Sequence, residues 1–147
     1  MTLHIKRLAY FLRADLMGVG IVPPYAVYSY DKEGKPVNLN HKYAIVILID
    51  QDFDTFNASD GKDWISNSQS MLSYSTSALL ACSIAEYIRR LGYPARAHHF
   101  LNYQVVVSPL LLWAGIGEMS RIGIVIFGPI RIPANLMFVI SGGLTWR

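Results

Sequence analysis

A glycine-rich turn between residues 114 and 121 carries the clearest pattern that points to chemistry in this sequence. Gly115 and Gly117 are followed directly by Glu118 and, three residues later, by Arg121. Because glycine has no Cβ, the backbone can pass close to a ligand here while charged groups stay nearby. We interpret the turn as part of a ligand site. The alternative is a connection between a short helix and a strand, with Glu118 and Arg121 paired on the surface.

Other residues that could hold a metal or act as a nucleophile form weaker patterns. His98 and His99 are adjacent, so in a strand they point to opposite faces and do not hold one metal ion together. We expect one buried and one exposed histidine. Cys82 is the single cysteine, which excludes an iron–sulfur cluster held by this chain alone, and we expect its thiol to be packed. Gly18-Val19-Gly20 lacks the third glycine of a dinucleotide-binding loop.

Two helices that position these residues are predicted from apolar residues recurring every three or four positions. The first ends at Gly18, and the second runs from about residue 63 to 91, where Gly92 suits a left-handed cap and Pro94 prevents continuation. The apolar face of the first consists of Ile5, Leu8, Ala9, Leu12 and Leu16. The apolar face of the second is expected to contain Leu72, Leu79, Ile84 and Ile88.

One strand stands out among those predicted. Residues 43–49, YAIVILI, form a continuous β-branched run that we expect to be a central strand buried on both faces. The other predicted strands are residues 19–22, 25–30, 95–103, 122–127 and 136–140. Helices and strands without regular alternation indicate a mixed α+β fold, and 147 residues suit a single domain.

The composition leaves apolar surface that needs a cover. Hydrophobic residues make up 52% of the chain and charged residues only 16%, against about 25% charged in ordinary soluble domains. Residues 105–144 carry only three charges, so this half packs deeply or faces a partner or a membrane, and self-association is expected. No uninterrupted apolar run is as long as a membrane span, which needs about 18 residues. The first residues do not have the pattern of a secretory signal. A net charge of +3 without a basic run argues against nucleic acid.

Three segments together carry a family resemblance. They are YSTSALLACSIAEYIRRLGYPARAHH from Tyr74, SPLLLWAGIGEMSRIG from Ser108, and Gly128-Pro129-Ile130-Arg131. In this order and at this separation they resemble the corrinoid-binding core of the cobalamin-dependent reductive dehalogenases, and more distantly that of the epoxyqueuosine reductases. The resemblance covers about residues 5–131. It implies a nitroreductase-like mixed sheet flanked by helices, with cobalamin as cofactor and reductive removal of halide from an organohalide as the reaction.

The resemblance also implies roles for individual residues. Tyr74 matches the tyrosine that delivers the proton replacing the halide, and Asn102 matches a polar residue that orients the phenol or the substrate. A phenol with a pKa of about 10 is a poor acid near neutrality unless a cation favours its phenolate. Arg131 matches that cation, with Arg121 as the competing candidate. The residues expected to contact the corrinoid are Ser70, Ser108, Gly115, Gly117, Glu118 and Arg121.

The sequence also departs from the family. Full-length relatives carry a cysteine-rich segment that holds two iron–sulfur clusters, and a twin-arginine export signal, and this chain has neither. Its last residues, ISGGLTWR, differ from the expected continuation. We therefore expect a truncated corrinoid-binding portion, inactive alone, whose iron–sulfur domain or membrane-anchor partner is missing. Relatives are membrane-associated on the exported side, whereas this chain, without a signal, is expected to remain cytoplasmic.

Two alternative functions stay open. One is another corrinoid-dependent reductase or processing protein, such as an epoxyqueuosine reductase, which shares the same core. The other is a non-catalytic remnant or a membrane-associated interaction protein, suggested by the apolar half from residue 105 onward.

Overall fold

The computed structural model describes residues 2–59, 65–99, 102–121, 125–126 and 134–141. Four α-helices, six strands and a short 3-10 turn, Pro24–Ala26, are found in these ranges. The helices are α1 (Thr2–Phe11), α2 (Phe53–Ala58), α3 (Ile65–Arg90) and α4 (Val107–Trp113). The strands are β1 (Leu16–Ile21), β2 (Tyr43–Asp50), β3 (Ala95–His98), β4 (Glu118–Met119), β5 (Val125–Ile126) and β6 (Ala134–Ser141).

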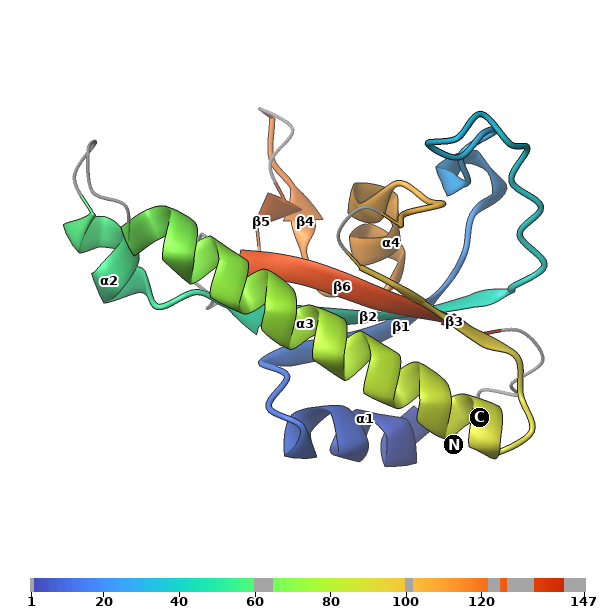
Figure 1. Ribbon diagram of the computed structural model, residues 1–147, viewed down its shortest axis with the longest axis horizontal. Coiled ribbons are helices and arrows are strands. Elements are labelled where there is room, and N and C mark those ends of the chain that lie inside the picture. Colours follow the sequence, from blue (N-terminus) through green and yellow to red (C-terminus); the bar gives the residue numbers. More distant parts are fainter. Residues whose placement is uncertain (1, 60–64, 100–101, 122–124, 127–133, 142–147) are drawn as a thin grey trace.

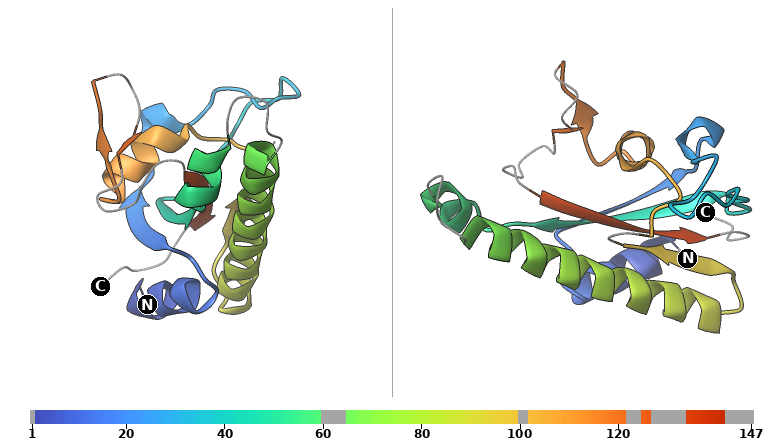
Figure 2. Two further views of the ribbon diagram at one scale, coloured as in Figure 1. Left: turned by 90° about the vertical axis from the view of Figure 1, so that its left-hand side faces the viewer. Right: turned by 45° about the horizontal axis from the view of Figure 1, so that its top comes forward.

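The main sheet has the strand order β1-β2-β6-β3, and every neighbouring pair is antiparallel. Helices α1 and α3 lie against one face of this sheet, and α4 lies against the other (Figures 1 and 2). The small hairpin of β4 and β5 stands on the same side as α4 (Figure 1). The predicted mixed α+β class is therefore confirmed.

Strand β2 separates two hydrophobic cores. Because side chains alternate along a strand, Ile45 and Ile47 face α1 and α3, whereas Val46 and Leu48 face α4. All four side chains are fully buried. The continuous apolar run of β2 is thus explained by burial on both faces, as the sequence predicted.

The first helix is shorter than the apolar spacing indicated. It ends at Phe11, and Arg13 takes a left-handed conformation with φ of 76° that turns the chain into β1. The N–H of Ala14 closes the helix end on the carbonyl of Ala9. The predicted continuation to Gly18 was wrong because Leu16, which fits the helical spacing, begins a strand instead.

Helix α3 matches its predicted extent but not its predicted face. Gly92 has the expected left-handed φ of 88°, and Ile84 and Ile88 are buried. Leu72 and Leu79 are 61% and 67% exposed, so their assignment to the core was wrong. The buried face of the first half of the helix contains serines that were overlooked because they are polar. They are Ser73 and Ser77.

These serines can be buried because a serine hydroxyl can donate its hydrogen bond to a backbone carbonyl of the same helix. Ser77 Oγ donates to the carbonyl of Ser73 at 2.7 Å, so no polar group is left without a partner at this contact. Cys82, which was expected to be packed, is exposed on the opposite side of the helix. Apolar spacing alone therefore misplaced the α3 face by about a third of a turn.

The remaining elements differ in their limits. β3 ends at His98 instead of residue 103, and the predicted strand at 25–30 begins with the 3-10 turn. Helix α2 was not predicted. Residues 134–141 confirm the last predicted strand, while of the strand predicted at 122–127 only Val125–Ile126 lies within the described residues. No helix in the described ranges is long and apolar enough to cross a membrane.

Candidate functional site

Tyr74 lies in the first half of α3, where its side chain is half-buried against the core shared with α1. Ser70 precedes it by four residues and so shares its helical face, as predicted. The hydroxyl of Ser70 donates to Oε1 of Gln51 at 3.3 Å. Gln51 follows β2 directly and is buried, so this contact ties the helix face that carries Tyr74 to the end of the central strand.

A second tyrosine, Tyr103, lies close to Tyr74. The pKa of Tyr103 is raised first by burial and second by the proximity of Tyr74, since two phenolates would repel each other. Tyr103 belongs to the loop after β3 and packs against the core on the α4 side of the sheet. No pattern in the sequence distinguished this tyrosine from the others, because Tyr74 and Tyr103 belong to segments that lie far apart in the chain.

Asn102 holds the loop that carries Tyr103. Its Oδ1 accepts the backbone N–H of His99 at 2.9 Å, and its Nδ2 lies 3.1 Å from Nε2 of the same histidine. Asn102 and Tyr103 also line a cavity of about 220 Å³, together with Arg96. Asn102, which was predicted to orient the phenol or the substrate, thus lies after β3 with its side-chain amide in contact with His99, and its predicted role stays a prediction.

The predicted glycine turn follows α4. Ser108 is half-buried in the first turn of that helix, and Gly115 after it has a left-handed φ of 66°. A Cβ added at Gly115 would meet nothing within 4 Å, so the turn is open on that side. Glu118 in β4 and Arg121 are both exposed, and no ion pair joins them in the described part of the chain.

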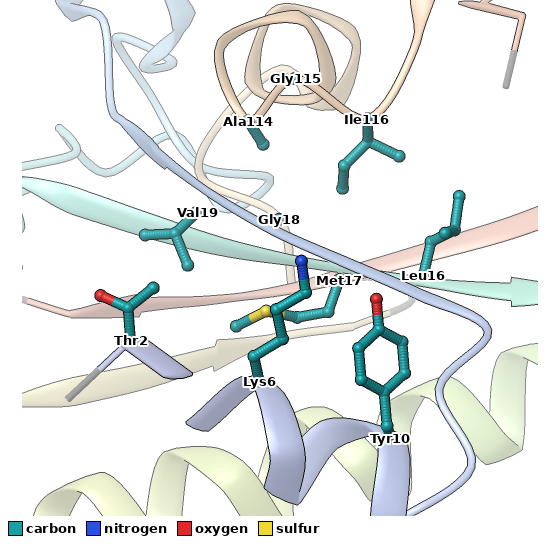
Figure 3. Close-up of a pocket in the computed structure, with 10 residues that line it drawn as sticks. All are labelled: Thr2, Lys6, Tyr10, Leu16, Met17, Gly18, Val19, Ala114, Gly115 and Ile116. Carbon is teal, nitrogen blue, oxygen red and sulfur yellow. The ribbon is translucent and has the colours of Figure 1, made fainter. Parts of the chain in front are cut away.

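The close backbone approach that glycine permits occurs at a different place. A Cβ on Gly18 would lie 2.6 Å from the carbonyl oxygen of Ala114, and one on Gly20 would lie 2.8 Å from the backbone of Trp113. The glycines of β1 thus let the end of α4 rest directly on the strand (Figure 3). The Gly18-Val19-Gly20 pattern, which resembled an incomplete cofactor loop, has a packing role.

The predicted site residues fall into two sets on opposite faces of the sheet. Ser70, Tyr74 and Asn102 lie on the α3 side or at its border, and the turn residues from Ser108 onward lie on the α4 side. The loop from 102 to 106 passes from one set to the other. Its path is fixed by backbone hydrogen bonds from Tyr28 to Gln104 and from Val106 to Ala26, of 2.9 and 2.7 Å. Arg131 lies outside the described residues.

Comparisons with known proteins identify what this arrangement resembles. No family model matches the chain. The tetrachloroethene reductive dehalogenase of Desulfitobacterium hafniense is 33% identical over 128 residues, which cover 84% of this chain and 22% of that protein. The solved structure of the catabolic reductive dehalogenase NpRdhA is 38% identical with a TM-score of 0.85, covering 94% of this chain and 20% of that one. Over most of its length, this chain matches a segment of the reductive dehalogenases.

The match confirms the resemblance inferred from the sequence motifs. A further structure with the same identity and TM-score is described as suggesting a mechanism for B12-dependent dehalogenation. The chain spans about one fifth of the length of these reductive dehalogenases. Neither the epoxyqueuosine reductases nor a non-catalytic remnant is better supported by the same comparisons. The roles of individual residues stay predictions.

The two histidines lie near the loop that carries Tyr103. His98 is fully buried, and burial, with Arg96 nearby, lowers its pKa to about 3. Its Nδ1 accepts the backbone N–H of Gln104 at 3.3 Å. The prediction of one buried histidine was correct, whereas His99, predicted to be exposed, is half-buried. Among the described residues no group of three or more His, Cys, Asp or Glu side chains is arranged to hold a metal ion.

Proposed function

We propose that this chain forms the corrinoid-binding portion of a reductive dehalogenase, which removes halide from an organohalide. The observation that supports this most strongly is 38% identity and a TM-score of 0.85 over 94% of the chain to NpRdhA. Residues 1–147 then form a single partial corrinoid-binding domain. The finer fold assignment, a nitroreductase-like sheet, rests on the family resemblance and belongs to this proposal.

The residues of the α4 side suit one wall of a cobalamin site. Leu112, Trp113 and Met119 are exposed apolar side chains around the open turn at Gly115, and they offer an apolar surface to a macrocycle. Pockets for drug-sized ligands measure about 300–1,000 Å³. A corrinoid is larger than such ligands, so this chain supplies a wall and other segments complete the enclosure.

Reductive dehalogenation replaces a carbon–halogen bond by a carbon–hydrogen bond, which consumes two electrons and one proton and releases halide. Bound cobalamin would supply the electrons, since no side chain is a comparable reductant. The O–H of Tyr74 would supply the proton. Burial first, and the proximity of Tyr74 second, raise the pKa of Tyr103, so Tyr103 is a neutral phenol near the proposed proton donor.

The proposal includes partners and a location. Iron–sulfur clusters on a separate domain would pass electrons to the corrinoid, and an organohalide would be the small-molecule partner. The exported face of a membrane, with a membrane-anchor partner, is proposed for full-length relatives. These points rest on the family resemblance.

A titration with cobalamin tests the central claim. The purified chain is mixed with cob(II)alamin, and the visible spectrum is followed in comparison with a buffer blank. We expect a saturable change in absorbance that is weakened in a Trp113→Ala variant and unchanged in Phe11→Ala, whose exposed ring lies on α1 away from the wall. A spectrum that stays identical to that of free cobalamin at all protein concentrations contradicts the proposed wall.

A further inference from the structure

A groove runs along the outer edge of β1. One part of it, a cavity of about 430 Å³, lies between α1 and the turn at residues 114–116, and the next part, of about 310 Å³, is lined by Tyr43 and Trp113. Both parts include Thr2 and Val19, so they are continuous along the strand. Figure 3 shows side chains of α1 on one side of β1 and those of the turn on the other.

Among the described strands, β1 ends its sheet on this side, which leaves its outer backbone groups available to a further strand. The N–H of Val22 donates to the carbonyl of Lys42 at 3.0 Å. In an antiparallel ladder the inward-facing residues recur every two positions, so Gly20 and Gly18 also face β2. The residues whose backbone groups face the groove are Met17, Val19 and Ile21. Their N–H and C=O groups form a template for strand addition.

The flanks of the groove select a single extended segment as its occupant. Lys6 and Tyr10 of α1 and Ile116 of the turn approach the strand from opposite sides (Figure 3). The β1 edge of a second copy carries the same flanks and would meet them before the two strands could pair. A peptide strand without layers of its own avoids this clash.

The lining of the groove also indicates the chemistry of its occupant. Lys6 is the one charged side chain among the described lining residues, and no acid accompanies it. Its Nζ lies 5.9 Å from the ring centre of Tyr10. At the other part of the groove, Ile21 and Trp113 are 51% and 56% exposed. A segment with an acidic side chain near Lys6 and an apolar one near Trp113 complements both parts.

We propose that the edge of β1 binds an extended acidic and apolar peptide segment of a partner protein, which adds to the sheet as a further strand. Backbone hydrogen bonds to β1 provide affinity, and Lys6 selects for the acidic side chain. No group of the Tyr74 set takes part in this contact, whereas Trp113 belongs both to the groove and to the proposed corrinoid wall.

Fluorescence anisotropy with two labelled octapeptides tests the selection by Lys6. Both probes alternate valine and threonine, and they differ only in a central glutamate or lysine. We expect the glutamate peptide to bind more tightly. Lys6→Glu should reverse the order, with a change of about fivefold or more in each Kd. Arg7→Glu makes the same charge change on an exposed residue of α1 outside the lining and should keep the original order.

The backbone contribution has its own test. N-methylation of alternate amides in the glutamate peptide removes the N–H groups that would donate to β1. We expect this methylated peptide not to bind the parent chain. Val19→Pro removes one outward N–H of β1, which an edge strand tolerates, and should weaken both peptides while circular dichroism shows the same fold. The proposal is overturned if neither peptide binds at millimolar concentration, if N-methylation has no effect, or if Lys6→Glu and Arg7→Glu act alike.

Discussion

Tyr74 and Tyr103 come from different segments, one on α3 and the other in the loop after β3, yet the phenol of Tyr74 contributes, after burial, to the raised pKa of Tyr103. Tyr74 was identified through its family motif. Tyr103 was not, because its proximity to Tyr74 arises only in the folded chain, where β3 pairs with β6 ahead of the loop that carries Tyr103. Residue types and local spacing contain no information about such a contact.

Replacing Tyr74 tests its proposed role as proton donor. In a complete homologous reductive dehalogenase, the change that corresponds to Tyr74→Phe should lower kcat by about 10²- to 10⁴-fold, since it removes a positioned acid. Corrinoid content, measured by the visible spectrum, should stay unchanged. The change corresponding to Tyr103→Phe should cause a smaller loss, because the proton donor remains. Full activity of the Tyr74 variant would refute the assignment.

His98 predicts how stability depends on pH. Its pKa is lowered from 6.5 to about 3 in the folded chain, so protonation favours the unfolded chain. The contribution of neutral His98 to the free energy of unfolding is complete above pH 6.5 and is lost progressively as the pH falls towards 3. Within this window the free energy of unfolding falls by up to about 1.4 kcal/mol per pH unit because of His98. After burial, the charges of Arg96, His41 and His99 add to the lowering of the His98 pKa.

Urea unfolding at several pH values measures this effect. His98→Gln should reduce the pH dependence of the unfolding free energy between pH 6.5 and 3, whatever its effect on stability at neutral pH. His4→Gln, at an exposed histidine on α1 that contacts Tyr87, is the matched control and should keep the dependence of the parent. Equal slopes in both variants would show that carboxylates, and not His98, dominate acid unfolding.

Among the elements, β2 and α3 were predicted from their sequences more accurately than the segments around them. The run 43–49 is apolar at every position, which only a strand buried on two sides requires. The α3 face was misassigned because Ser73 and Ser77 are buried while Leu79 is exposed. The end of α1 was missed because Arg13, not a glycine, takes the left-handed conformation. Local apolar spacing does not report on either effect.

The contact between α4 and β1 predicts the effect of filling Gly18. In Gly18→Ala the new Cβ meets the backbone oxygen of Ala114, which cannot rotate away as a side chain would. We expect a loss of about 1–3 kcal/mol in the free energy of unfolding. Ile21→Thr, a half-exposed position on the same strand, should change it by less than about 0.5 kcal/mol. Similar losses in the two variants would mean that α4 moves away from β1 at little cost.

At the scale of the whole molecule, this chain spans about one fifth of the length of its relatives. The remaining segments of those proteins are long enough to cover surface that is exposed here. Leu72 and Leu79 lie seven residues apart on one side of α3, and both are mostly exposed. Such an apolar stripe on the molecule favours association. The sequence predicted excess apolar surface from composition but placed these leucines in the core.

Light scattering at increasing protein concentration measures this association. We expect the apparent mass of the parent chain to rise, and the double change Leu72→Gln and Leu79→Gln to reduce the rise. Phe11→Gln removes a large exposed apolar side chain of α1 and serves as the control for surface hydrophobicity in general. A parent chain that stays a monodisperse monomer would count against the exposed α3 stripe as a contact surface.

The central position of β2 also determines when, during synthesis, the sheet can be completed and protected from aggregation. β2 pairs with β1, which precedes it closely, and with β6, which is made about ninety residues later. Because synthesis is slow compared with hairpin formation, β1 and β2 can pair while the outer edge of β2 waits for its second neighbour. That open, apolar edge is a template for aggregation. A nascent chain is therefore most dependent on chaperones from the emergence of residue 50 until residues 134–141 have left the ribosome.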